Sequence, residues 1–356
     1  MTMMPDQTAP AMNLSGMTAM LREAREAPEV VARLIERNAP LCRELGARLR
    51  ASQPPFAVTC ARGSSDNAAT FIKYLLEIHS GLVTASVGPS VTSVYDARPR
   101  MRGALFLAVS QSGRSPDILN LAAAGRDDGA LTVALVNDTS SPLASTCEVV
   151  LPLHAGAEKS VAATKSFIAA LAAGFQLVAH WSQDEALLAA LDTLPDALGR
   201  AAEIDWSPAL PLLSRANNLF VVGRGVGFAM AQEVALKLKE TSGIHAEAMS
   251  SAELMHGPWT LAGDHFPILV LSQRDETLSG VNDLVSKLNE QGVPVVVAGA
   301  AEGPAPVVLP SIEDAHPFLA PIALIQSFYP LVNAIAQARG RNPDSPPRLR
   351  KVTETL

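Results

Sequence analysis

Three serines, a glutamine and a glycine follow directly on an apolar run in the stretch LFLAVSQSGRSPDILNLAAAGRDDG, residues 105–129. The run has the composition of a buried strand, and a leucine- and alanine-rich helical pattern begins after the polar turn. The start of a helix presents unpaired N–H groups and the positive end of the helix dipole, which together favour an anion. Hydroxyl and amide donors complete such an anion-binding site, and Gly113 lets the backbone approach a ligand closely. The turn is therefore predicted to hold a phosphate through Ser110, Gln111, Ser112 and Ser115.

Helix capping is the alternative explanation of these serines. Ser112 or Ser115 could cap the helix, with Pro116 at its first position. Capping accounts for one serine, however, and not for three together with a glutamine and a glycine. An earlier turn, ARGSSDNAA, repeats the same composition, and we favour phosphate binding over capping as the explanation. The earlier turn contributes Gly63, Ser64 and Ser65.

A later stretch, EVALKLKETSGIHAEAMSSAELMHGPWTLAGD at residues 233–264, carries groups that could move protons. Lys237 and Glu240 are three positions apart and share one helix face. Such a pair is more often a solvated surface pair, worth roughly 0.3 kcal/mol. Glu253 and His256 follow in a predicted loop, where a lone histidine is usually exposed or satisfied by the core. A glutamate and a histidine near a phosphate-binding site can also transfer protons on a sugar phosphate.

These groups lie in two copies of one strand–turn–helix pattern. PFAVTCARGSSDNAA aligns with NLFVVGRGVGFAMA, which places Arg62-Gly63 on Arg224-Gly225. LFLAVSQSGRS aligns with PILVLSQRDET at the same offset, and ALTVALVND and VVLPL match GVPVVVAGA and VVLPS. Four recurring strands that alternate with helices predict an α/β fold with parallel sheets covered by helices on both faces.

The turn of the second copy that aligns with this phosphate-binding turn has different residues. Arg274 and Asp275 stand where the first copy has Ser112 and Gly113. A carboxylate in this turn would repel a phosphate, so we expect that only the first copy binds one.

The repeat also predicts the organisation of the chain. A polar, proline-rich ending reads either as a frayed tail or as a segment with a role of its own. The expected parts are a helical lead-in over residues 1–35, a first domain over 36–184, a helical connector over 185–208, a second domain over 209–340 and a tail over 341–356.

Composition limits the partners and the setting. The 356 residues carry a formal net charge of -7, which disfavours nucleic acid as a partner. The first residues lack the regions of a signal peptide, and the longest apolar stretch is too short to cross a membrane. Cys42, Cys60 and Cys147 form no motif and are expected to be reduced thiols, so we expect a cytoplasmic protein without a membrane partner.

No spacing in the sequence indicates a metal or a cofactor, and we expect neither. GRGVGFA lacks the spacing of a dinucleotide fingerprint. The histidines carry no HExxH motif and no cysteine pairing, and those considered are His245, His256, His265 and His316.

Several motifs together resemble a known family. SQSGRS, EKSVAATKSF, ALKLKE, IHAEA, AELMHGP and LRKVT are similar, in this order, to motifs in the isomerase half of glucosamine-6-phosphate synthases. That half consists of tandem sugar isomerase (SIS) domains, so the resemblance implies two flavodoxin- or Rossmann-like three-layer sandwiches. SQSGRSPDIL, SVAATKS and KVTETL resemble still more closely the SIS-type glucosamine-6-phosphate deaminases, which lack the glutaminase domain.

The resemblance also implies roles for individual residues. Glu240 corresponds to the base that moves a proton between C1 and C2, with Lys237 beside it. His256 corresponds to the residue that opens the sugar ring from the neighbouring subunit, which implies a homodimer. Lys351 corresponds to a tail lysine that lies over the active site and can form a Schiff base with the ketose. The substrate-binding positions so implied are Ser64, Ser65, Ser110, Gln111, Ser112, Ser115, Val161 and Ala163.

Some positions depart from the synthase pattern. Thr2 follows Met1 where the synthases carry the cysteine nucleophile of their glutaminase domain. Arg114 stands for an acidic residue, Ala163 for a serine that touches the sugar, and Arg350 for a small residue before the tail lysine. These departures put the individual substrate in doubt, but not its class, the phosphosugars.

The expected activity is therefore the conversion of glucosamine 6-phosphate and water to fructose 6-phosphate and ammonia. Alternatives are another phosphosugar aldose–ketose isomerase, a fructosamine-6-phosphate deglycase, or glucosamine-6-phosphate synthesis from ammonia. A non-catalytic sugar-phosphate sensor that binds a regulatory partner is a further alternative. A sensor would not need Glu240, His256 and Lys351 together, and all three are present.

Overall fold

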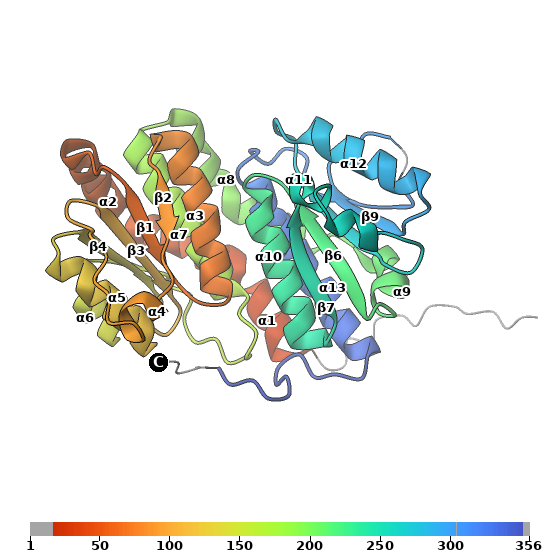
Figure 1. Ribbon diagram of the computed structural model, residues 1–356, viewed down its shortest axis with the longest axis horizontal. Coiled ribbons are helices and arrows are strands. Elements are labelled where there is room, and N and C mark those ends of the chain that lie inside the picture. Colours follow the sequence, from red (N-terminus) through yellow and green to blue (C-terminus); the bar gives the residue numbers. More distant parts are fainter. Residues whose placement is uncertain (1–16, 304, 352–356) are drawn as a thin grey trace, which may run out of the picture.

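The computed structural model describes residues 17–303 and 305–351. It contains two parallel five-stranded sheets, with strand orders β2-β1-β3-β4-β5 and β10-β9-β8-β6-β7 (Figure 1). The second order, read from its other end, is the first order with each strand replaced by its repeat counterpart. The predicted tandem α/β fold with two parallel sheets is confirmed.

The first copy follows two helices that begin the described chain, α1 (Ala19–Arg25) and α2 (Ala27–Ser52). Its strands are β1 (Ala57–Cys60), β2 (Thr84–Ser86), β3 (Leu105–Ser110), β4 (Leu131–Val136) and β5 (Val149–Pro152). Its helices are α3 (Ser64–Ser80), α4 (Ser90–Ser93), α5 (Pro116–Asp127), α6 (Pro142–Thr146) and α7 (Lys165–Ser182).

The second copy follows α8 (Glu185–Ala202), a 3-10 turn at Ser207–Ala209 and α9 (Leu210–Leu213). Its strands are β6 (Asn218–Gly223), β7 (His245–Ser250), β8 (Ile268–Ser272), β9 (Val295–Gly299) and β10 (Val307–Leu309). Its helices are α10 (Gly227–Lys237), a π-helical turn at Leu238–Ser242, α11 (Ser251–Leu254), a 3-10 turn at Pro258–Leu261, α12 (Leu278–Glu290) and α13 (Ala320–Ala338).

Each sheet has one strand more than the repeat predicts. The additional strands, β2 and β7, pair with β1 and β6 at the sheet edge. β7 runs from His245 to Ser250, and most of its side chains are partly or fully exposed. An edge strand of this kind has no continuous apolar run, and for this reason the sequence predicts a loop there.

One hydrophobic core runs through both copies. α7 and α13 are buried along most of their length and belong to the same cluster of packed side chains. Separate clusters on the opposite faces of the two sheets lie beneath α5 and α12. Gly174 on α7 lets α3 approach closely, because a Cβ at this position would overlap the side chain of Ile72. The two copies are therefore packed against each other rather than joined only by the connector.

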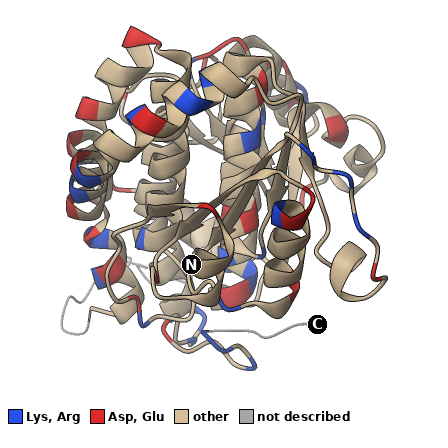
Figure 2. Cartoon of the chain, turned by 90° about the vertical axis from the view of Figure 1, so that its left-hand side faces the viewer, with Lys and Arg blue, Asp and Glu red and all other residues tan. Residues whose placement is uncertain are grey.

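Three further features concern the expected domain boundary, the membrane and the surface charge. α2 runs without a break through residue 35, where the sequence places the end of the lead-in, and it packs against α7. None of the helices in the described residues combines the length and the hydropathy needed to cross a bilayer. On the face drawn in Figure 2, acidic and basic residues are interspersed rather than gathered by sign.

Candidate active site

A cavity of about 600 Å³ lies beyond the carboxyl ends of β1 and β3. In the first sheet, β2 lies on one side of β1 and β3 lies on the other, so the order in which the parallel strands are added reverses between β1 and β3. Ligands of such sheets bind at this switch point. Both copies and the tail contribute to its wall. The lining residues are Arg62, Gly63, Ser64, Ser65, Val109, Ser110, Gln111, Ser112, Ser115, Ile118, Val161, Ala163, Lys237, Glu240, Leu349, Arg350 and Lys351.

The turn after β3 forms one wall of this cavity. Ser115 is the residue that precedes α5, but its side chain makes no capping hydrogen bond. The Oγ of Ser110 accepts a hydrogen bond from the N–H of Gly113 over 3.0 Å, which closes the turn. Gly113 has φ of +63°, and a Cβ there would overlap the side chain of Ser141. The alternative of capping therefore does not explain Ser115, which lines the cavity instead.

The turn after β1 forms the adjoining wall. Gly63, with φ of +57°, precedes α3, and Ser64 and Ser65 lie in the first turn of that helix. The helix therefore points the positive end of its dipole at the cavity. Arg62 adds a cation that the sequence analysis missed, and its guanidinium lies 2.7 Å from Oδ2 of the buried Asp117. Its position directly before the Gly-Ser-Ser run is the signal that could have identified it.

Lys237 and Glu240 line another wall of the cavity and are not a solvated surface pair. The Lys237 side chain is 1% exposed, and its Nζ donates to Oε2 of Glu240 and lies 3.5 Å from Oε1 of Glu233. Burial by itself would lower the pKa of Lys237, but Glu233 and Glu240 raise it above its usual value. Lys237 is therefore held as an ammonium beside the Glu240 carboxylate.

The α10 helix widens into a π-helical turn at Leu238–Ser242, and Glu240 lies in that turn. Such turns are frequent at functional sites. The Glu240 side chain is 23% exposed and lines the cavity, while its neighbour Lys237 is buried. A partly solvated carboxylate next to a fixed ammonium can accept a proton from a bound ligand and return it.

Glu233 belongs to the same buried cluster, and the sequence analysis did not identify it as a site residue. It is fully buried and accepts hydrogen bonds from Oγ of Ser64 over 3.0 Å and from Nδ2 of Asn67 over 2.8 Å. Burial raises the pKa of Glu233, although the Lys237 ammonium opposes this shift. Glutamates at the first and eighth positions of EVALKLKE lie on the same side of the helix as Lys237, a spacing that could have indicated the cluster.

Lys351 reaches the same cavity from the end of the described chain. Its Nζ donates to Oε2 of Glu158 over 2.9 Å, and the Glu158 side chain is completely buried. In Figure 1 the tail leaves the second copy after α13 and passes to the first. Asp344 anchors this path, because its carboxylate accepts the N–H groups of Ala19 and Met20 at the start of α1. The tail is therefore tied to the rest of the chain at Asp344 and again at Lys351, although residues 347–350 between them are exposed.

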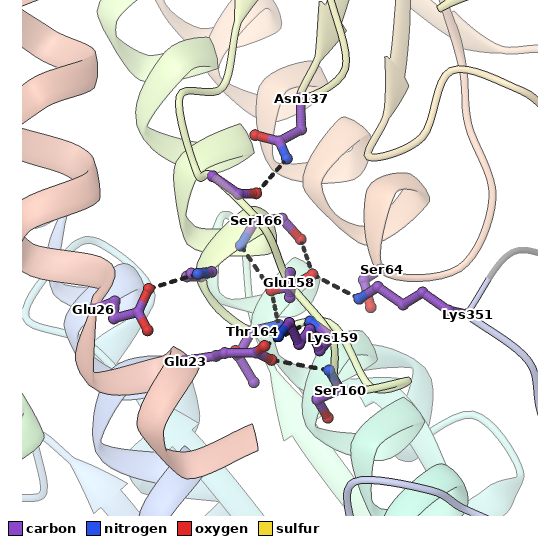
Figure 3. Close-up of polar contacts among 12 residues, drawn as sticks. Glu23, Glu26, Ser64, Asn137, Glu158, Lys159, Ser160, Thr164, Ser166 and Lys351 are labelled. Atoms are coloured by element: carbon purple, nitrogen blue, oxygen red, sulfur yellow. Dashed lines mark hydrogen bonds and ion pairs between the residues drawn. The ribbon is translucent and has the colours of Figure 1, made fainter. Parts of the chain in front are cut away.

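Val161 and Ala163 line the cavity from the segment between β5 and α7. The carboxylate of Glu23 on α1 accepts the N–H groups of Lys159 and Ser160 over 2.6 and 3.1 Å (Figure 3). A helix outside the two repeats therefore shapes the wall of the cavity.

His256 does not reach this cavity within the chain. It is exposed, between α11 and the 3-10 turn at Pro258–Leu261, and is not among the lining residues. Its contribution from a neighbouring subunit stays a prediction. The other predicted site residues, from both turns, α10 and the tail, meet at one cavity.

In the second copy the aligned turn is filled by its own side chains. Oδ2 of Asp275 accepts a hydrogen bond from Nε2 of Gln273 over 2.8 Å, and Oδ1 accepts the N–H of Thr277 over 2.8 Å. The donors that would face a phosphate are thus engaged by an internal carboxylate.

Relatives of known sequence place the chain in context. The SIS domain model matches residues 55–180 and 212–303. An isomerizing glutamine–fructose-6-phosphate aminotransferase of Thermus thermophilus is 32% identical over 365 aligned positions. The match covers 93% of this chain and 58% of that protein, so the chain spans little more than half the length of this relative.

Solved structures agree with this assignment. A candidate phosphosugar isomerase from Silicibacter pomeroyi DSS-3 has 43% identity and a TM-score of 0.87, covering 92% of this chain and 100% of that one. The glucosamine-6-phosphate deaminase of Thermotoga maritima superposes with a TM-score of 0.73 over 95% of this chain and 100% of its own, a likeness of fold at 20% identity. Because the family model matches both copies and more than half of the residues, the chain belongs to the SIS domain family.

Proposed function

We propose that the protein is an isomerising glucosamine-6-phosphate deaminase, which converts glucosamine 6-phosphate and water to fructose 6-phosphate and ammonia. The observation that carries this proposal is the meeting of two chemistries at one cavity. Ser110, Gln111 and Ser115 offer neutral donors for a phosphate on one wall, and Glu240 and Lys237 line another wall of the same cavity. A phosphosugar bound by its phosphate at the first wall would present its sugar carbons to the second.

The proposed reaction begins with opening of the pyranose ring by His256 of the partner subunit, which exposes the C1 aldehyde. Glu240 then takes the proton from C2 and returns it to C1. Together with loss of one proton from the amino nitrogen and gain of one by O1, this transfer converts the 2-amino aldose into a 2-imino ketose. Water adds to the imine carbon and ammonia leaves, so that fructose 6-phosphate remains.

Lys237 supports the proton transfer through its charge. Its ammonium is fixed between Glu233 and Glu240 and would stabilise the negative charge that develops on the substrate oxygens. Its hydrogen bond to Oε2 of Glu240 would also hold the side chain that accepts the C2 proton in place. Lys351, at the edge of the same cavity, would close the site over the bound sugar.

A second candidate is the opposite net reaction, synthesis of glucosamine 6-phosphate from fructose 6-phosphate and free ammonia. It is supported by the 32% identity to an aminotransferase of which this chain spans 58%. The same Glu240 proton transfer would serve both directions. Val161 and Ala163 line the cavity, and they are the positions where a deglycase or another isomerase would differ.

The proposed working unit is a homodimer, because His256 lies outside the cavity of its own chain. The division into two domains, a connector and a tail is likewise a proposal. The proposed setting is the cytoplasm, where the free and buried Cys42, Cys60 and Cys147 would stay reduced.

Ammonia release from a panel of phosphorylated amino sugars tests the function. The panel contains glucosamine 6-phosphate, its N-acetyl derivative, a fructosamine 6-phosphate and unphosphorylated glucosamine. We expect turnover of glucosamine 6-phosphate and little of the unphosphorylated sugar. Faster turnover of the fructosamine phosphate would replace this proposal with a deglycase.

A further inference from the structure

Glu158 is a buried carboxylate that the proposed reaction does not use. It lies between β5 and α7, in the segment that also carries Val161 and Ala163 of the cavity wall. Its side chain is 0% exposed, yet it contacts the amine of Lys351, which lines the cavity (Figure 3). A buried carboxylate that is hydrogen-bonded to a lysine at the cavity edge can affect the charge and position of that lysine.

Four hydrogen-bond donors surround the two oxygens of Glu158. Oε1 accepts the N–H groups of Thr164 and Ser166 over 3.0 and 3.1 Å. Oε2 accepts the hydroxyl of Ser166 over 2.6 Å and the Nζ of Lys351 over 2.9 Å. Three of these donors belong to Thr164 and Ser166 at the start of α7, so the carboxylate also caps that helix.

This arrangement favours the ionised form of Glu158. The two backbone N–H groups and the Lys351 ammonium can only donate, so a protonated carboxyl would lose bonds that the carboxylate makes. Burial by itself would raise the pKa of Glu158, but the Lys351 charge and the hydrogen bonds hold it below its usual value. A fixed negative charge in the interior requires a positive partner.

Other charged and titratable groups near Glu158 come from the elements packed around it. Lys237 and Tyr329 interact with it electrostatically from α10 and α13. Lys237, however, makes its direct contacts with Glu233 and Glu240. Glu23 holds the neighbouring N–H groups of residues 159 and 160 from α1. Lys351 is therefore the lysine that directly neutralises Glu158.

We propose that Glu158 is a positioning residue for Lys351, which it holds at the cavity edge as an ammonium. Lys351 thus meets a bound phosphosugar as a cation. It can form an imine only after it leaves Glu158 and loses its proton. This inference rests on the proposed function in that it treats the cavity as a phosphosugar site.

The experiment traps imines at Lys351 with pyridoxal 5′-phosphate, an aldehyde that carries a phosphate. The free amine attacks the aldehyde carbon, water leaves, and borohydride reduces the imine to a stable secondary amine. Peptide mass spectrometry then measures the labelled fraction of Lys351 from pH 6.5 to 10 in the full-length protein. The variants are Glu158→Gln, which removes the counterion, and Glu158→Asp, which retains it.

Glu23→Gln is the matched control. It removes another buried carboxylate that holds the same segment, but Glu23 does not contact Lys351. We expect Glu158→Gln to label Lys351 about tenfold more than wild type at pH 7.5, equivalent to one unit of pH. Glu158→Asp and Glu23→Gln should keep the wild-type dependence on pH.

Two outcomes would overturn the inference. One is an unchanged dependence on pH in a folded Glu158→Gln variant. The other is an equal shift in Glu23→Gln, which would mean that loosening of the segment causes the effect. If Glu158→Gln does not fold, the wild-type protein decides, with the exposed Lys239 as an internal reference. Lys351 should then require a higher pH than Lys239, and labelling at the same or a lower pH contradicts the inference.

The labelling does not depend on turnover, which separates this inference from the proposed function. A wild-type protein that releases no ammonia but shows the expected labelling would contradict the deaminase reaction alone. A wild-type protein that releases ammonia but labels Lys351 alike in all variants would contradict the role of Glu158 alone.

Discussion

The hydroxyl of Ser64 donates a hydrogen bond to Oε1 of Glu233 over 3.0 Å, and this bond joins the two copies of the repeat at the cavity. Ser64 begins α3 of the first copy, and Glu233 lies on α10 of the second. The polar turn before α3 and the Glu233–Lys237–Glu240 cluster are therefore held in a fixed relation. Substitutions in either copy are accordingly expected to affect the same site.

Glu240→Gln should remove most of the ammonia release and leave the fold intact. A glutamine keeps the shape of Glu240 but cannot accept the C2 proton, and such transfers contribute about 100- to 10,000-fold. Turnover of glucosamine 6-phosphate measures the loss, and circular dichroism measures the fold. Glu247→Gln, at an exposed glutamate of β7, is the control. Near-normal turnover by Glu240→Gln would remove this residue from the mechanism.

Ser115→Ala should weaken phosphosugar binding with little effect on stability. An alanine at a working N-cap costs about 1 kcal/mol, but the Ser115 side chain makes no capping hydrogen bond. We expect the KM to rise several-fold and the urea midpoint to stay near that of wild type. Ser141→Ala is the comparison, because its side chain does cap α6. Loss of stability in Ser115→Ala with an unchanged KM would favour the capping explanation.

His256→Ala and Glu240→Gln should complement each other if His256 acts in the partner subunit. A mixed dimer then has one site with both substitutions and one site with neither. Random mixing of equal amounts should restore about a quarter of the wild-type sites. Ammonia release after co-refolding measures this. Activity no higher than the sum of the two variants would place His256 outside the partner's site.

The contribution of Glu158 to stability should decrease as the pH falls. Its pKa is lower in the folded protein than the usual 4.5. The stabilisation is therefore fully present above about pH 4.5 and is lost as the pH falls through the folded-state value. Urea unfolding at pH 7, 5.5 and 4 measures the free energy of unfolding. The difference in this free energy between wild type and Glu158→Gln should become smaller toward pH 4. A difference that grows on acidification would contradict the ionised carboxylate.

Much of the fold could be predicted because its signals are local. Continuous apolar runs such as 105–109 identify central parallel strands, and the recurrence of four runs identifies the tandem copies. β7 was missed because an edge strand half exposed to solvent has no such run. Ser110 and Ser112 were identified because a polar turn between a strand and a helix has few structural uses.

The rest of the site depends on contacts between distant parts of the chain. Glu233 and Lys237 resemble an ordinary surface pair in the sequence, and only their burial between α3 and α10 changes their meaning. Glu158 stood within a recognised motif, but its role became visible only when the tail brought Lys351 within 2.9 Å.

The sequence by itself determined the two α/β copies, the polar turns of the first and the altered turn of the second. These follow from residue types within one strand–turn–helix unit, where hydrogen-bond donors and helix start are neighbours in the chain. Only the tertiary structure decided which charges are buried, which carboxylate faces which lysine, and that His256 lies apart from the cavity. The physical reason is that the charge state of an acid or an amine depends on its solvent exposure and its neighbours in space, and local sequence encodes neither.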